Sequence, residues 1–221
     1  MLLLSIAAFG QDRIPGDSSK YRYLPTGVRI GTDLIALGKS KYVDYYKGWE
    51  LNFDTDIYRR YYVAVDYGTS TSDFTLKNGV YHNNGRYLRV GVDINFLLKD
   101  PDRNMFFVGF RHGHANYSDY TDYVYEDPDF KTITVHAANS NPTANWKELT
   151  TGLRVKVWKF IWMGATARMK FRYRGKNQWE LLSYEVPGYG RTIKNNWWGI
   201  NYQIFIRIPV RNDNPRPVIK P

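Results

Sequence analysis

The chain has 221 residues, a formal net charge of +10 and no cysteine, which excludes a disulfide framework, a cysteine-based zinc site and a thiol nucleophile. Its lysines and arginines are spread singly along apolar stretches, so we expect many of them to pair within the molecule and predict no nucleic-acid partner. The 19 tyrosines, 7 tryptophans and 11 phenylalanines favour strands and membrane interfaces.

The chain begins with an apolar run, residues 1–10, that ends in small residues at Ala8 and Gly10. This run is typical of the end of a signal peptide, here truncated because its basic first region is missing; the alternative is a first strand. Residues 11–27 are then expected to form a periplasmic N-terminal segment. The best later apolar stretch, Val157 to Ala165, is broken by Lys159 and is shorter than the roughly 20 residues of a spanning helix. A membrane location would therefore require a barrel.

Strict alternation of apolar and polar residues recurs down the chain and predicts β-strands. In the clearest case Leu88, Val90 and Val92 share one face. The strands are predicted at 28–38, 48–57, 61–72, 86–97, 105–115, 145–158, 161–174 and 196–208. Short connections near 58–60, 98–104 and 159–160 alternate with long ones near 39–47, 73–85, 116–144 and 175–195. The pattern predicts an all-β fold, an eight-stranded antiparallel up-and-down transmembrane β-barrel over residues 28–208, followed by a Pro-rich periplasmic tail at 209–221.

Alternation alone does not say which face points outward, because a soluble lipocalin-like barrel that binds a ligand has the same period. Glycines on the polar face, such as Gly91 and Gly164, suit a crowded interior. Aromatic residues also gather near the predicted strand ends, where they are expected to form interfacial girdles. The predicted girdle contains Trp49, Trp146, Trp158, Trp162, Trp197 and Trp198. The alternative for any of these is a core aromatic.

Charges on the polar face are mostly acidic in the first half of the chain and basic in the second. In a narrow eight-stranded lumen the two halves are expected to pair, because an unpaired buried charge is costly. The predicted network contains Asp33, Glu50, Asp54, Asp66, Arg89, Asp93, Arg111, Arg154, Lys156, Arg168, Lys170 and Arg207. We therefore predict a closed lumen; the alternative is an anion path lined by the surplus basic residues.

The strongest catalytic candidate is the segment from His112 through His114 to Ser118, which contains a possible base and nucleophile. In strand geometry both histidines fall in the outward phase, so we predict neither an enzyme nor a metal centre there. The acidic, tyrosine-rich residues 119–129 are expected to form a solvated loop, with binding of calcium or a partner protein as the alternative. The glycines Gly188 and Gly190 are interpreted as turn geometry.

Several stretches resemble an uncharacterised family of small outer-membrane β-barrels from the Bacteroidota, a domain family of unknown function. They are Gly31-Thr-Asp33, Gly48-Trp-Glu-Leu-Asn52, Tyr87-Leu-Arg-Val-Gly-Val-Asp93, Phe107-Val-Gly-Phe-Arg111, Trp146-Lys-Glu-Leu, Gly152-Leu-Arg-Val-Lys156 and Val186-Pro-Gly-Tyr-Gly-Arg-Thr192. The resemblance implies the bacterial outer membrane and brings no activity or cofactor. The sequence thus predicts a structural or accessory subunit of an envelope complex, with outer-membrane lipid and other envelope proteins as partners. A lipid-modifying barrel enzyme and the soluble ligand-binding barrel remain as alternatives.

Overall fold

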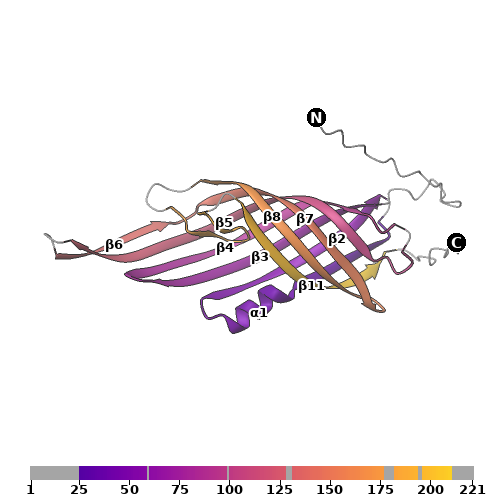
Figure 1. The fold of residues 1–221 in the computed structure, drawn as a ribbon, viewed down its shortest axis with the longest axis horizontal. Coiled ribbons are helices and arrows are strands. Elements are labelled where there is room, and N and C mark those ends of the chain that lie inside the picture. Colours follow the sequence, from indigo (N-terminus) through magenta and orange to yellow (C-terminus); the bar gives the residue numbers. More distant parts are fainter. Residues whose placement is uncertain are drawn as a thin grey trace, which may run out of the picture.

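The fold is a closed barrel of eight antiparallel strands (Figure 1). The computed structural model describes residues 25–58, 60–98, 100–127, 131–176, 182–193 and 196–210. The barrel strands are β1 (Gly27–Asp33), β2 (Tyr46–Tyr58), β3 (Tyr61–Leu76), β4 (Gly79–Asn95), β5 (Met105–Asp127), β7 (Thr143–Trp158), β8 (Ile161–Lys176) and β11 (Trp197–Pro209). The register of β1 against β11 closes the ring, since Gly27 lies opposite Pro209 and Asp33 opposite Gln203. The predicted eight-stranded antiparallel barrel is confirmed.

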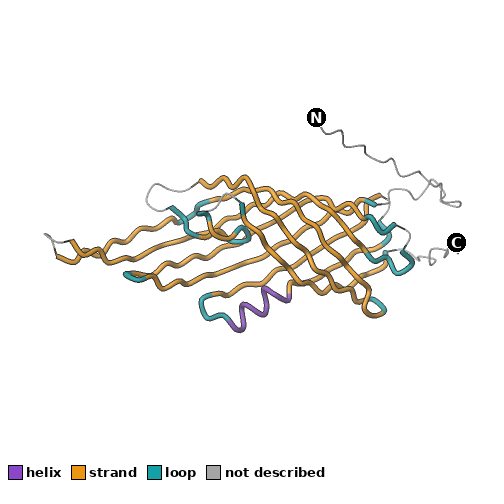
Figure 2. Tube along the Cα trace, viewed as in Figure 1, coloured by secondary structure: helices purple, strands orange, loops and turns teal. Residues whose placement is uncertain are grey.

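The first strand ends earlier than the sequence predicted. Residues 34–38 belong to the helix α1 (Leu34–Tyr42), which lies outside the barrel wall (Figure 2). The helix begins here because the Asp33 carboxylate accepts a hydrogen bond from the Ile35 N–H at 3.1 Å and so caps the first turn. Within the described residues, no helix is long and apolar enough to span a membrane.

Two of the predicted long loops are strands instead. Strands β3 and β4 run on through residues 73–85 and meet at a tight turn, where Leu76 lies opposite Gly79. Strand β5 continues to Asp127, and β6 (Lys131–Asn139) returns beside it. The outer face of these segments carries fewer apolar residues, so the apolar alternation fades, while pairing with the neighbouring strand continues along them. The prediction of a solvated loop at 119–129 is therefore wrong for 119–127.

The two ends of the barrel differ as the loop lengths predicted. The connections from β2 to β3, from β4 to β5 and from β7 to β8 lie at one end, the short-turn rim, where the Val210 N–H donates to the Thr26 carbonyl at 3.2 Å. The other end, the long-loop rim, carries α1, the extension of β3–β6 and residues 182–193. The predicted signal peptide at 1–10 and most of the segments at 11–27 and 209–221 lie outside the described residues.

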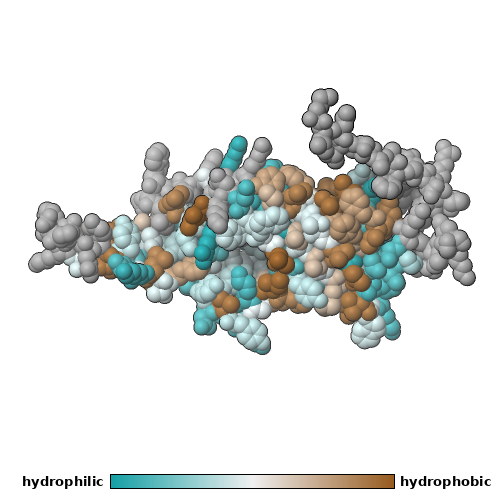
Figure 3. Space-filling view, in the orientation of Figure 1, coloured by the Kyte–Doolittle hydropathy of each residue, from teal (hydrophilic) through white to brown (hydrophobic). Residues whose placement is uncertain are grey.

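The strands turn polar residues inward and apolar residues outward. Along β4, Arg89 and Asp93 are at most 1% exposed, whereas Val90 between them is 44% exposed. The same contrast recurs on β11, where Gln203 is buried and Ile200 is exposed. Figure 3 shows apolar side chains gathered mainly over the part of the barrel nearer the short-turn rim. The polar face predicted for the lumen is therefore the inward face.

Candidate functional site: a charge network that fills the lumen

The lumen is filled by charged side chains of both signs. Among the described residues, seven acidic and six basic side chains line the barrel interior, each less than 10% exposed. They are Asp33, Glu50, Asp54, Asp66, Asp93, Asp119 and Glu148, with Arg29, Arg89, Arg111, Arg154, Arg168 and Lys170. Nearly equal numbers of opposite charges let a narrow interior hold ions that would each be costly to bury alone.

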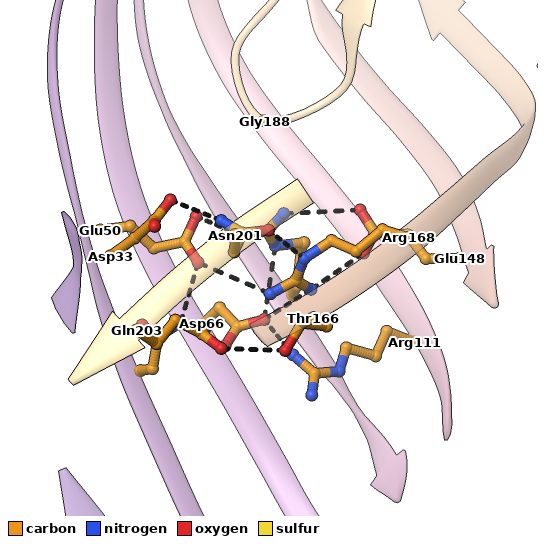
Figure 4. Close-up of polar contacts among 12 residues, drawn as sticks. Asp33, Glu50, Asp66, Arg111, Glu148, Thr166, Arg168, Gly188, Asn201 and Gln203 are labelled. Carbon is orange, nitrogen blue, oxygen red and sulfur yellow. Dashed lines mark hydrogen bonds and ion pairs between the residues drawn. The ribbon is translucent and has the colours of Figure 1, made fainter. Parts of the chain in front are cut away.

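The centre of the network forms around Asp66 and Arg168 (Figure 4). The Arg168 guanidinium donates to Asp66 at 3.1 Å and to Glu148 at 3.2 Å, and its Nε donates to the Asn201 side-chain oxygen at 2.6 Å. The Arg111 guanidinium also donates to Asp66. Acidic and basic residues from opposite sides of the barrel therefore meet across its axis, as the charge distribution along the chain predicted.

A second group forms around Glu50. The Arg89 guanidinium donates to the Glu50 carboxylate, and the Tyr87 hydroxyl donates to the same oxygen at 2.7 Å. The Asn52 amide donates to Glu50 at 2.8 Å and to Asp66 at 2.7 Å. This amide joins the two groups into one network.

Toward the short-turn rim, arginine and aromatic side chains fill the lumen. Arg154 donates to Asp54 at 2.7 Å, and Arg29 donates to the same carboxylate at 2.6 Å. The Arg154 guanidinium lies 4.6 Å from the Phe107 ring centroid and 5.0 Å from that of Phe205. Both rings are buried. Cation–π contact with the two rings therefore adds to the stabilisation of this cation by the Asp54 carboxylate.

Toward the long-loop rim, residues 182–193 fold over the lumen. They contain the paired strands β9 (Glu185–Val186) and β10 (Gly190–Arg191), and we call them the plug hairpin. Lys170 donates to the carbonyls of Gly188 and Tyr189 at 2.7 and 3.0 Å. The fully buried Tyr189 ring packs edge-on against Trp146, with centroids 5.8 Å apart. The plug hairpin is thus fastened to the charge network below it.

The glycine at the tip of the plug hairpin has a structural reason. Gly188 has φ +77°, and a Cβ added there would lie within 2.5 Å of the Tyr87 ring. The left-handed backbone and the close ring together require glycine. The predicted turn geometry is confirmed at Gly188, whereas Gly190, which also has a positive φ, begins strand β10.

Two residues predicted for the network lie outside it. Lys156 is partly exposed and pairs with Asp102 at 2.9 Å near the short-turn rim. Arg207 donates to the Thr26 hydroxyl at 3.2 Å at the same rim. Both have the inward phase, but they stand so close to the strand ends that their long side chains reach the rim.

The prediction also missed two members of the network, Glu148 and Arg29. Glu148 shares the inward phase of β7 with Thr150 and Arg154, so the alternation itself marked its position. The charge pattern did not indicate Glu148, because Glu148 is an acidic residue in the mainly basic second half of the chain. Arg29 is the reverse exception and pairs with Asp54 on the neighbouring strand.

The predicted aromatic girdle is only partly outward-facing. Trp49, Trp158 and Trp198 are exposed, and Trp197 is half-buried. Trp146 and Trp162 are at most 4% exposed and lie inside the barrel, so their assignment to the girdle is wrong. They occupy the inward phase of β7 and β8, where Trp146 donates to Glu148 at 2.7 Å.

The catalytic candidates lie on the outer wall. His112 is exposed and His114 is half-buried, in the outward phase predicted for them, and His114 Nδ1 lies 2.9 Å from the Asn145 side-chain oxygen. Of the acidic run, Asp119 points inward and accepts hydrogen bonds from Tyr81 and Asn139, each at 3.0 Å. Within the described ranges, no group of three potential ligands could hold a metal ion.

Comparison with known proteins places the chain in a family. No match was found among curated proteins. Among solved structures, the crystal structure of CarO from Acinetobacter baumannii matches 84% of this chain and 98% of that chain, with 7% sequence identity and a TM-score of 0.40. The family described as domain of unknown function DUF6048 matches residues 1–213. The chain therefore belongs to the DUF6048 family.

Proposed function

We propose that this protein is a barrel of the bacterial outer membrane, closed by its own side chains, that serves as a structural or accessory subunit of an envelope complex. The observation that carries the proposal is the inverted distribution of polarity. Ile30, Leu153 and Ile200 are between 45% and 69% exposed. The polar residues Arg29, Arg154 and Gln203 of the same strands are at most 3% exposed. Continuous apolar surface of this kind is unfavourable in water and favourable in lipid.

The size of the apolar band fits a bilayer. From Leu88 on β4 to Phe96 just beyond it, the outward residues are all apolar, and the eight steps between them at about 3.3 Å each make a stretch of about 26 Å along the strand. Nine residues lie within the roughly 9–11 that a tilted strand needs to cross a bilayer. Beyond Leu88, outward Arg86 and Asn84 are exposed and polar. The band therefore has an edge on the long-loop side.

The filled lumen favours a structural role over transport or catalysis. Across the described residues, the ion pairs, the arginine–aromatic layer and the plug hairpin fill the lumen with charged groups that are already hydrogen-bonded within the protein. A passage for ions requires binding groups that can exchange partners with the ion, whereas these groups already bind one another. The cross-strand partners of the outward-facing His112 and His114 are Val90, Leu88, Lys147 and Asn145, none of which is Ser, Thr or Cys. We therefore propose neither enzymatic activity nor a cofactor.

The first test is the membrane fractionation of cells that express the full chain, followed by gel migration with and without boiling. Recovery in the outer membrane with a heat-dependent shift in migration supports the proposal, and co-purification would then identify the envelope partners. Recovery as a soluble periplasmic protein would contradict it and favour the ligand-binding alternative.

Two further measurements separate the remaining alternatives. Reconstituted into planar bilayers, the barrel is expected to give no steady conductance, whereas anion-selective currents would favour the anion path. The double variant H112A/H114A is expected to leave cellular lipid composition unchanged. A lipid change that depends on these histidines would favour an enzyme.

A further inference from the structure

We propose that the outer wall of β4, β5, β7 and β8, just beyond the apolar band on the long-loop side, binds the phosphate-bearing head group of an anionic membrane lipid. The inference rests on the proposed membrane location and names one lipid class that the barrel would select. The site, which we call the basic patch, consists of Arg86, His112, His114, Lys147 and Arg174.

The strand register brings these side chains together on one face. His112 lies opposite Lys147 across β5 and β7, and His114 lies opposite Asn145. Asn145 in turn lies opposite Arg174 on β8. On the other side, Arg86 of β4 lies opposite Asn116, two residues beyond His114. Because neighbouring strands are about 4.8 Å apart, the patch spans four strands and about 15 Å, which is wide enough for a lipid head group.

The basic patch borders the apolar band directly. Toward the long-loop rim, the next outward residue after Leu88 on β4 is Arg86. In the same direction, His112 comes next after Phe110 on β5, and Lys147 comes next after Leu149 on β7. The Lys147 ammonium stands 5.8 Å from the Phe110 ring centroid, and the Phe110 and Phe171 rings are 6.4 Å apart. Acyl chains lying on these rings would therefore place their head groups at the level of the basic side chains.

Positive charge in the patch has no acidic counterpart among the neighbouring outward positions that the structure describes. None of the outward positions described on residues 84–90, 110–118, 143–149 and 167–175 is Asp or Glu. By contrast, Lys156 near the short-turn rim pairs with Asp102 at 2.9 Å. Two amide side chains, Asn116 and Asn145, lie among the basic residues and add hydrogen-bonding groups. A phosphate offers the negative charge and the acceptor oxygens that such a set recognises.

The test compares lipid binding by the detergent-purified full chain using native mass spectrometry. The probes are phosphatidylglycerol and phosphatidylcholine with identical acyl chains. The variant R86Q/K147Q/R174Q removes three positive charges from the patch. The matched control K39Q/K41Q/K47Q removes three from exposed positions of α1 and β2.

We expect the wild type and the control to prefer phosphatidylglycerol, and the patch variant to bind it about tenfold or more weakly with unchanged phosphatidylcholine binding. Equal affinity of the wild type for the two lipids would overturn the inference, as would equal losses in the patch and control variants. Displacement of phosphatidylglycerol by millimolar inorganic phosphate alone would also overturn it, by assigning the patch to a free anion.

Gel migration of each variant before and after boiling keeps the two proposals distinguishable. A barrel that shifts on heating but shows no lipid preference contradicts only the lipid site. A protein that stays monodisperse without detergent contradicts the proposed membrane location as well.

Discussion

At the scale of single residues, Arg168 holds the lumen together because it reaches three partners at once. It contacts Asp66, Glu148 and Asn201 inside the barrel, with no more than 1% of its surface exposed. Replacing such a group leaves its partners buried and underpaired, which costs more than the pair itself contributes.

The substitution Arg168→Met is therefore expected to lower the free energy of unfolding by about 3–5 kcal/mol. Urea titration of the protein in lipid vesicles measures this loss. The double variant R168M/E148Q should recover part of it, because the second change removes one of the stranded carboxylates. Additive losses in the double variant would contradict coupling within the network.

A second residue, Glu185 of the plug hairpin, makes the docking of that hairpin depend on pH. Burial raises the pKa of Glu185 above its ordinary value of 4.5, although Lys39, Arg191 and Lys170 oppose the shift. The docked state therefore binds the proton more tightly than the undocked state does. The stabilisation of the docked hairpin by protonated Glu185 is complete below pH 4.5 and is lost as the pH rises through the raised pKa.

Hydrogen exchange of residues 183–192 measures this dependence, once it is corrected for the intrinsic effect of pH on exchange. Protection in the wild type is expected to fall as the pH rises from about 4 upward. In Glu185→Gln, which stays neutral, protection should no longer depend on pH. The same pH dependence in both proteins would show that another group is responsible.

At the scale of elements, the plug hairpin and the strands beneath it form one packed unit. Tyr189 and Val186 are buried with Trp146 and Tyr117, and the Tyr117 hydroxyl donates to the Ser183 hydroxyl at 2.9 Å. The hairpin itself has only two residue pairs in its β9–β10 ladder. Its position therefore depends on side-chain anchors rather than on its own backbone pairing.

Truncating the main anchor, Tyr189→Ala, is expected to destabilise docking by about 3 kcal/mol or more, because a fully buried ring leaves a cavity. Limited proteolysis should then cut within residues 182–193, while the heat-dependent gel shift of the barrel persists. The exposed neighbour Ile193→Ala serves as the control and should remain resistant. Loss of the gel shift in Tyr189→Ala would mean that the hairpin is required for the barrel to form.

At the scale of the whole molecule, the apolar faces of the strands point outward, and this direction decides whether the barrel is more stable in lipid or in water. Leu153 lies in the middle of the apolar stretch of β7, between Val155 and Leu149, and is 49% exposed. A charge on a water-exposed surface changes stability little, whereas one at the middle of a bilayer costs about 2–4 kcal/mol.

Leu153→Arg is accordingly expected to lower the stability of the vesicle-embedded barrel by about 2–4 kcal/mol in urea titrations. Asn84→Arg, on the outward face beyond the apolar band, is the matched control and should change stability by less than about 0.5 kcal/mol. Equal and small effects of the two substitutions would contradict burial of this wall in lipid.

The sequence by itself determined the eight barrel strands, their inward and outward phases and the asymmetry of the two rims, because alternation is a local property of each strand. It also placed Asp66 and Arg168 inside. The inward positions of Glu148, Trp146 and Trp162 follow from the same alternation. Only the tertiary structure decided the partners of these residues and the place of Lys156 at the rim, since partners depend on strand register around the closed ring and the place of Lys156 depends on its height above the rim. The strand extensions at 73–85 and 116–127 were likewise decided by pairing with a neighbour, which satisfies the backbone even where the outward side chains give no apolar signal.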